Sequence, residues 1–270
     1  MFRTIFKFTI EILPSGGTPI ELLGVTSVYT SLLLNEVYLN NDQIQFLHDK
    51  LPGITWISCC GVIFESPTGF RHLLQTFNSI RELELDGGEF GDCGDLVLPK
   101  MKRLLATDVL PMGLRNVTFG KLHALDIWSG SQDPELITHI LKRHPRITDL
   151  SLPLDPLRWG GIGEAISHLP IAYLGFSPTR YPGQVSDIIP LDVFREVILS
   201  CYPLKHLVTV DISLCFKDHE DMEVEEANDL IAEINRHVNH LTSLHTRVTS
   251  LLLEKILTPD LVRYLHSFLK

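Results

Sequence analysis

The sequence predicts an α/β solenoid, in which a curved parallel sheet lines the concave side and helices cover the convex side. Three observations predict this fold: a short apolar triplet that recurs along the chain, a nearly constant spacing between its copies, and helix-like segments that precede several of them. Because a single strand–helix unit cannot bury its apolar face alone, units of this kind must stack into an array.

The triplet places apolar residues at the first, fourth and sixth positions of each unit. The fourth and sixth residues lie two apart, so they point to the same face of a short strand. The spacing between successive units is 24, 25, 26, 21, 21, 25, 24, 36 and 41 residues, and seven consecutive intervals therefore stay within 21 to 26. The ten units are Ile5/Phe8/Ile10, Tyr29/Leu32/Leu34, Ile54/Ile57/Cys59, Ile80/Leu83/Leu85, Met101/Leu104/Ala106, Leu122/Leu125/Ile127, Ile147/Leu150/Leu152, Ile171/Leu174/Phe176, Leu207/Val210/Ile212 and Val248/Leu251/Leu253.

Helix-like segments complete the repeating unit. They are expected at residues 42–51, 69–77, 134–143, 163–169 and 191–201. Three units also share a longer phrase that begins at Pro52, Pro99 and Pro145, where proline ends a preceding element and directs the chain into the next strand. The expected core includes Leu83, Leu85, Leu125, Ile127, Leu150 and Leu152.

The phrase Pro-x-Ile-x-x-Leu-x-Leu, clearest at residues 145–152, resembles the leucine-rich-repeat region of F-box-type proteins, in the divergent form common in fungi. No F-box phrase is recognised, and residues 8–14 contain some of its residue types in another order. The resemblance implies one solenoid with a repeat array over residues 1–215. Irregular repeats, an acidic insertion at residues 218–226 and capping helices follow within residues 216–270. It also implies the capture of a protein, as in the substrate-recognition part of an F-box-like ubiquitin ligase adaptor.

The third, fifth and seventh positions of each unit alternate with the core positions and would form the concave face. Eight acidic residues stand there against two basic ones, with Trp and Tyr residues interleaved. Exposed aromatic residues in an acidic field favour a protein partner with a basic and apolar surface. The candidate partner-binding residues are Trp56, Glu82, Glu84, Asp86, Arg103, Asp126, Trp128, Asp149, Tyr173 and Asp211.

Composition excludes several other classes of function. The net charge of -10 argues against nucleic-acid binding, which needs clustered Lys and Arg. No run of 18 apolar residues predicts a membrane span, and no signal peptide is recognised. Five cysteines, an odd number without a CxxC motif, favour free thiols in a reducing compartment, so we expect a cytoplasmic or nuclear protein.

An enzyme is the alternative interpretation. The glycines at 160, 161 and 163 are similar to the phosphate-binding turn of nucleotide-binding dehydrogenases, although a repeat turn at the start of a helix explains them better and no Tyr-x-x-x-Lys motif follows. His237, His240 and His245 fall near an amphipathic helical pattern and predict no metal site. We therefore expect no catalytic residue and no cofactor. A third interpretation is a fragment whose missing N-terminal segment carries the effector function.

Overall fold

The computed structural model describes residues 9–12, 29–107, 110–128, 133–154, 166–178, 209–214 and 243–248. Contacts divide the chain into two compact units, residues 1–127 with 131–144, and residues 128–130 with 145–270, and each is described by itself. The described part of the first unit contains the helices α1 (Asn41–Lys50), α2 (Gly69–Thr76) and α3 (Pro134–Arg143), and the short 3-10 helix η1 (Met112–Leu114). None of the described helices is long and apolar enough to cross a membrane.

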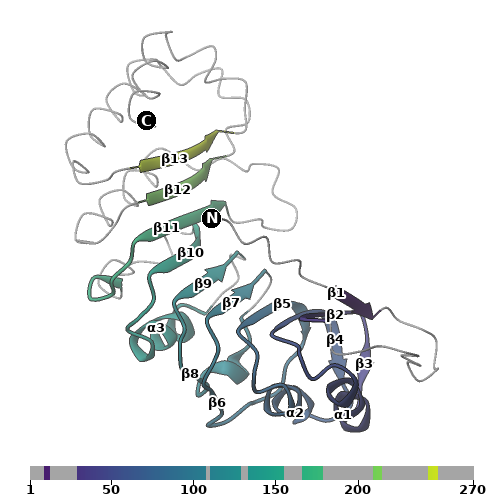
Figure 1. The fold of residues 1–270 in the computed structure, drawn as a ribbon. Coiled ribbons are helices and arrows are strands. Elements are labelled where there is room, and N and C mark those ends of the chain that lie inside the picture. Colours follow the sequence, from purple (N-terminus) through teal and green to yellow (C-terminus); the bar gives the residue numbers. More distant parts are fainter. Residues whose placement is uncertain are drawn as a thin grey trace, which may run out of the picture. The chain divides into compact units, whose positions relative to one another are not determined.

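The main sheet of the first unit consists of parallel strands that lie side by side in their order along the chain (Figure 1). These are β1 (Thr9–Ile12), β2 (Ser31–Asn35), β4 (Trp56–Phe64), β5 (Glu82–Glu89), β7 (Arg103–Ala106) and β9 (Ala124–Ile127). The short strand β3 (Tyr38–Leu39) pairs with the end of β4. Between the later strands, β6 (Val97–Leu98) and β8 (Thr118–Phe119) form a second, two-stranded parallel sheet.

The second unit repeats this strand order. Its strands are also parallel and follow one another in chain order: β10 (Asp149–Leu154), β11 (Tyr173–Pro178), β12 (Thr209–Leu214) and β13 (Ser243–Val248). The predicted α/β class, with a parallel sheet flanked by helices, is therefore confirmed. The predicted division at residue 215 stays a prediction.

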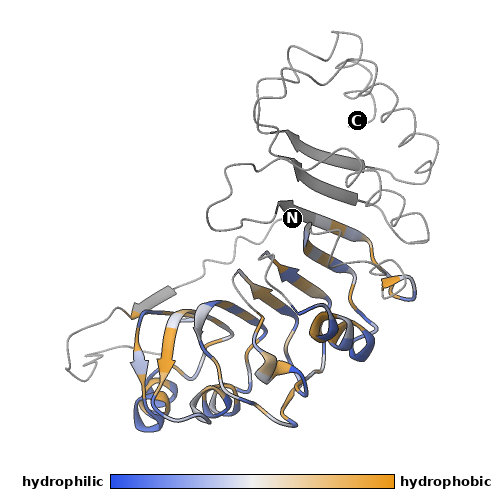
Figure 2. Cartoon of the chain, turned by 180° about the vertical axis from the view of Figure 1, so that it is seen from behind, coloured by the Kyte–Doolittle hydropathy of each residue, from blue (hydrophilic) through white to orange (hydrophobic). Residues whose placement is uncertain are grey.

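The core consists of the fourth and sixth residues of the units. All six predicted core residues are at most 1% exposed, and Leu32, Leu34, Ile57, Cys59, Leu104 and Ala106 are buried to the same extent. Hydrophobic and hydrophilic residues alternate along the strands and around the helices (Figure 2). The period of two in the sequence thus separates a buried face of the sheet from a polar one.

Two of the three helices, α1 and α3, begin at a side-chain cap. Asn40 and Gln43 form a reciprocal capping box at the start of α1, with two hydrogen bonds of 2.9 Å between side chain and backbone. At α3 the Asp133 carboxylate accepts from the backbone N–H of Glu135, and Pro134 occupies the first turn. The helices predicted at 42–51, 69–77 and 134–143 are confirmed. Residues 191–201 and 163–165 lie outside the described residues.

Two predicted frames are wrong. Thr9 pairs with Ser31, so Ile10 and Ile12, not Phe8 and Ile10, take the fourth and sixth positions of the first unit. Ser243 pairs with Thr209, so the last strand lies seven residues earlier than Val248/Leu251/Leu253 predicts. With so many apolar residues, a triplet fits several frames, and only strand pairing fixes which one is used.

Leu125 gives a test of the register. Leu125→Ala is expected to destabilise the protein by about 2–5 kcal/mol, because it removes a fully buried side chain and leaves a cavity. Chemical denaturation measures the change. Val97→Ala, at a side chain that is 57% exposed, is the control and should change the free energy of unfolding by less than about 0.5 kcal/mol. Equal effects would contradict the assignment.

Candidate functional site

The register aligns the predicted partner-binding residues of the first unit on one face of the sheet. Ser31, Trp56, Glu82, Arg103 and Ala124 occupy one row across adjacent strands. The next row consists of Leu33, Ser58, Glu84, Leu105 and Asp126, and the third of Asn35, Cys60 and Asp86. We call these three rows the alternate face, because they alternate with the core positions. Six of the ten candidate residues belong to it.

The side chains of the alternate face differ in exposure. Asp86 and Arg103 are exposed, whereas Trp56, Glu82 and Glu84 are half-buried. Asp126 is only 8% exposed, and its Oδ2 accepts hydrogen bonds from Nε and Nη2 of Arg103 at 2.8 and 2.7 Å. Arg103 lies opposite Ala124, so Asp126 is its diagonal neighbour on the next strand. The carboxylate of Asp126 is thus neutralised within the sheet, and the other acids of this face, Glu82, Glu84 and Asp86, lie on β5.

Glu36 is an additional acidic residue that the sequence reasoning missed. It follows β2 directly in a left-handed conformation with φ 50°, and its backbone N–H donates to the carbonyl of Cys60 at 2.7 Å. Gly61 and Gly87, at the same position of the next two units, have φ values of 59° and 65°. The two glycines at this eighth position of the unit could have predicted a left-handed turn from the sequence. That turn places Glu36 beside the end of the alternate face.

The charges of these acids act on the thiol of Cys60. Burial raises the pKa of its thiol, and Asp86, Glu36 and Glu84 raise it further; the thiol donates a hydrogen bond to Asp86 Oδ2 at 3.6 Å. On the opposite face of the same strand, burial raises the pKa of Cys59 to about 12. A raised pKa disfavours the thiolate, which is the nucleophilic form. At both positions the protonated thiol is therefore favoured over the thiolate.

An exposed apolar pair lies beside these acids at the carboxyl ends of the strands. Tyr38 on β3 pairs with Ile63 on β4, and their side chains are 58% and 46% exposed. Ile63 in turn lies opposite Glu89 on β5. This end of the first unit therefore offers exposed carboxylates and apolar groups on adjacent strands.

The remaining candidate residues belong to the second unit. Asp149 pairs with Tyr173, and both are half-buried, whereas Trp128 is 54% exposed. Asp211 lies opposite Gly175 in the strand register, and His245 of β13 lies opposite Asp211. Whether all ten residues form one surface stays a prediction.

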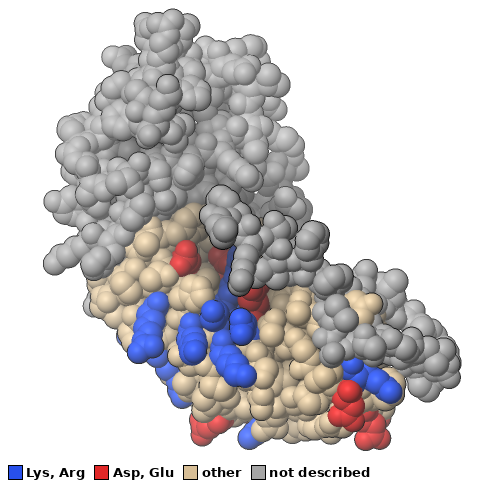
Figure 3. Space-filling model, in the orientation of Figure 1, with Lys and Arg blue, Asp and Glu red and all other residues tan. Residues whose placement is uncertain are grey.

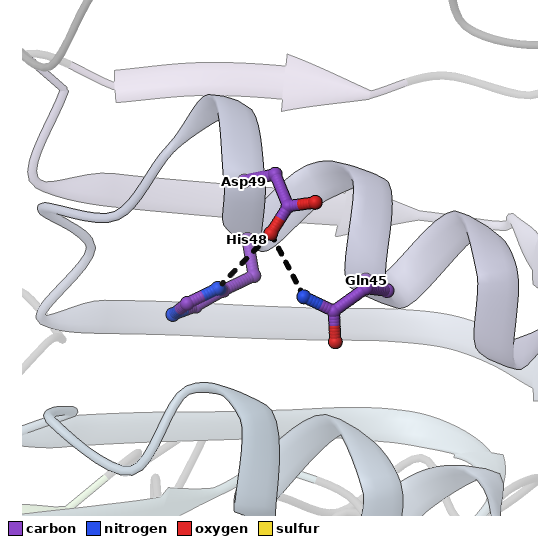
Figure 4. A network of polar contacts seen from close by, with 3 residues as sticks. All are labelled: Gln45, His48 and Asp49. Atoms are coloured by element: carbon purple, nitrogen blue, oxygen red, sulfur yellow. Dashed lines mark hydrogen bonds and ion pairs between the residues drawn. The ribbon is translucent and has the colours of Figure 1, made fainter.

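Other polar clusters in the described residues are local. On α1, Asp49 Oδ1 accepts a hydrogen bond from Gln45 Nε2 at 2.8 Å and lies 3.7 Å from His48 Nδ1 (Figure 4). The His48 ring also packs edge-on against Phe77, with 5.3 Å between ring centroids, and so connects α1 with the end of α2. No group of three or more metal-binding side chains occurs among the described residues. The glycine turn at 160–163, His237 and His240 lie outside them.

The comparisons with known proteins address the fold alone. No family model and no curated protein matches the sequence. A solved protein of Bacteroides fragilis is similar with a TM-score of 0.52 at 10% identity; the match covers 83% of this chain and 66% of that one, just under two thirds of its length. A complex of latrophilin 3, Unc5D and the leucine-rich-repeat protein FLRT2 matches at 12% identity, over 84% of this chain and 85% of that one, but its TM-score is only 0.29.

The pair of Arg103 and Asp126 is expected to be structural. Arg103→Ala should destabilise the protein by about 1–3 kcal/mol, since it leaves a buried carboxylate without its partner. The double variant Arg103→Ala/Asp126→Ala should recover part of that loss. Denaturation of the two single variants and the double variant measures the coupling. Strictly additive effects would contradict a coupled pair.

A buried histidine provides a second, pH-dependent test. His144 caps α3, is 5% exposed and packs on Phe119, with 5.2 Å between ring centroids. Burial lowers its pKa to about 4, and the charge of Arg143 contributes. In the unfolded chain a histidine takes up its proton near pH 6.5, so between about pH 6.5 and 4 the unfolded state binds more protons than the folded state. Stability should therefore decrease as the pH falls through this window.

His144→Gln should remove that part of the pH dependence. We expect the wild type to lose about 3 kcal/mol more than the variant between pH 7 and pH 4, as measured by urea denaturation at each pH. His123→Gln, at an exposed histidine, is the control and should retain the dependence of the wild type. Parallel curves for wild type and His144→Gln would rule out this role of His144.

Proposed function

We propose that the chain is a leucine-rich-repeat solenoid that serves as a protein-binding scaffold. The single observation that carries the proposal is the register: successive parallel strands align the third and fifth residues of five units, and the seventh residues of three, in rows. Such rows create an extended surface whose chemistry can be varied residue by residue while the core stays the same, which is how repeat proteins bind their partners.

The partner that fits best presents basic and apolar groups. Glu84 and Asp86 lie on the alternate face, and exposed Glu36 and Glu89 stand at its carboxyl end. Tyr38 and Ile63 supply exposed apolar surface next to them. Carboxylates guide a basic partner and speed its association, while apolar and aromatic anchors slow its dissociation. The half-buried Trp56, in the same row as Glu82, extends this surface toward the amino ends of the strands.

The wider biological role rests on the sequence resemblance alone. A repeat scaffold of the F-box type would present its bound protein to a ubiquitin ligase. If the chain acts in this way, a ligase adaptor should be present among the proteins that it captures, and no adaptor is expected if it acts as a free-standing scaffold. Affinity capture with mass spectrometry distinguishes the two.

Charge reversal on β5 tests the proposed surface. Glu84→Lys/Asp86→Lys should remove specific partners from the captured set and slow the association of the identified partner by about tenfold or more at low salt, because the change replaces attraction by repulsion. Quantitative mass spectrometry and surface plasmon resonance measure these effects.

The matched control is Asp42→Lys/Glu135→Lys. Both residues are exposed on helices, and the double change alters the net charge by the same amount. It should retain the partners and their association rates. Identical captured sets for the wild type, the face variant and the control would refute binding through the alternate face.

A further inference from the structure

The segments that lead into β5, β7 and β9 carry a cluster of basic residues, beside Glu82 at the start of β5, in a chain whose net charge is -10. No Asp or Glu occurs in these segments, which are residues 78–81, 99–103 and 118–124. They contain five Lys or Arg residues and one histidine, all of them exposed. We call these six residues the basic edge: Arg81, Lys100, Lys102, Arg103, Lys121 and His123.

Strand pairing places these residues next to one another. The backbone N–H of Lys102 donates to the carbonyl of Arg81 at 2.7 Å, and that of His123 donates to the carbonyl of Lys102 at 3.0 Å. Neighbouring strands lie about 4.8 Å apart, so equivalent positions follow each other at that interval. Figure 3 shows Lys and Arg side chains gathered where, in the same orientation, the amino ends of these strands lie in Figure 1.

Only part of this positive charge is compensated. Arg103 pairs with Asp126, and Lys100 Nζ donates to the Ser79 hydroxyl at 3.1 Å. Within the part of the chain that the structure describes, Arg81, Lys102 and Lys121 make no ion pair with a carboxylate. Like charges at such spacing repel one another, and an anion bound across them relieves that repulsion.

A further cation stands beside this edge. Arg143, at the end of α3, donates from Nη2 to the Thr118 hydroxyl at 2.9 Å and remains exposed. Thr118 begins the β8 segment that leads to Lys121, so this hydrogen bond holds a guanidinium on the α3 side of the basic edge. The basic residues before the three strands and Arg143 at the end of α3 thus form a positive surface, whereas the exposed Glu65, Asp86 and Glu89 stand at the carboxyl ends of β4 and β5.

We propose that the basic edge binds a short acidic segment of a protein partner. Three strands span about 10 Å, the length of roughly three residues of extended chain, so a few consecutive Asp or Glu residues suffice to meet the cations. A long polyanion such as a nucleic acid would extend beyond this surface and meet the repulsion of a chain at -10. Arg103 belongs to both surfaces, but the proposal concerns the opposite partner charge, and Arg81, Lys102 and Lys121 lie outside the alternate face, so either proposal can fail without the other.

Fluorescence anisotropy with the full chain tests the proposal. The probe is a labelled peptide of alternating Glu and Asp, about eight residues long, and the reference is the same peptide built from Gln and Asn. We expect the acidic peptide to bind and the neutral one not to bind. Binding should weaken strongly between about 50 and 200 mM NaCl, because the attraction is electrostatic. Absence of acidic-peptide binding at the lower salt concentration would overturn the proposal.

Two matched triple variants locate the site. Arg81→Gln/Lys102→Gln/Lys121→Gln should weaken peptide binding by about tenfold or more, whereas Lys50→Gln/Arg115→Gln/Lys142→Gln should change it by less than about twofold. Both remove three positive charges from exposed side chains. Equal losses in the two variants would mean nonspecific attraction and contradict the proposal. The single variant Lys102→Gln, expected to weaken binding about threefold, guards against misfolding of the triple variant.

Binding of a single-stranded oligothymidylate of about twelve nucleotides distinguishes a site for an acidic protein segment from a site for nucleic acid. We expect it to bind more weakly than the acidic peptide. Tighter binding that the Arg81, Lys102 and Lys121 changes abolish would make this edge a nucleic-acid surface and refute the protein-segment proposal.

Discussion

Each strand of the first unit can bury its two inward residues only because another strand lies beside it in the same parallel register. The side chains at the fourth and sixth positions contact their counterparts in the adjacent units, and together they form the core. A one-residue slip would exchange the buried and polar faces of a strand. The register therefore determines which residues are available to a partner, and both proposed binding surfaces depend on it.

The parallel arrangement also gives the first unit two chemically different ends. All amino ends of the strands lie along one edge of the sheet and all carboxyl ends along the other, so residues from units about 21–26 positions apart accumulate at a common edge. Basic residues accumulate at the amino ends of β5, β7 and β9, and exposed acids with Tyr38 and Ile63 at the carboxyl ends of β2 to β5. An antiparallel sheet would mix the two sets and cancel their fields.

Charge in the sequence differs from charge available at the surface. Asp126 and Glu84 occupy the same row of the alternate face, yet Asp126 is buried against Arg103 while Glu84 is half-exposed. A carboxylate that is paired with a cation contributes little net potential to an approaching partner, so counting acids at alternating positions overestimates the acidic field. Glu36 has the opposite effect, because a left-handed turn brings an acid that lies outside the alternating pattern close to Cys60.

Periodicity, caps and spacing in the sequence predict the α/β class, the three described helices, the parallel order of the strands and core residues such as Leu125 and Ile127. These features depend on patterns that act over a few residues. Strand pairing in the folded chain fixes the frames of the first and last strands, the pairing of Arg103 with Asp126 and the clustering of Arg81, Lys102 and Lys121. These depend on which residues become neighbours across strands, and side-chain contact over more than twenty residues of chain is set by register rather than by local pattern.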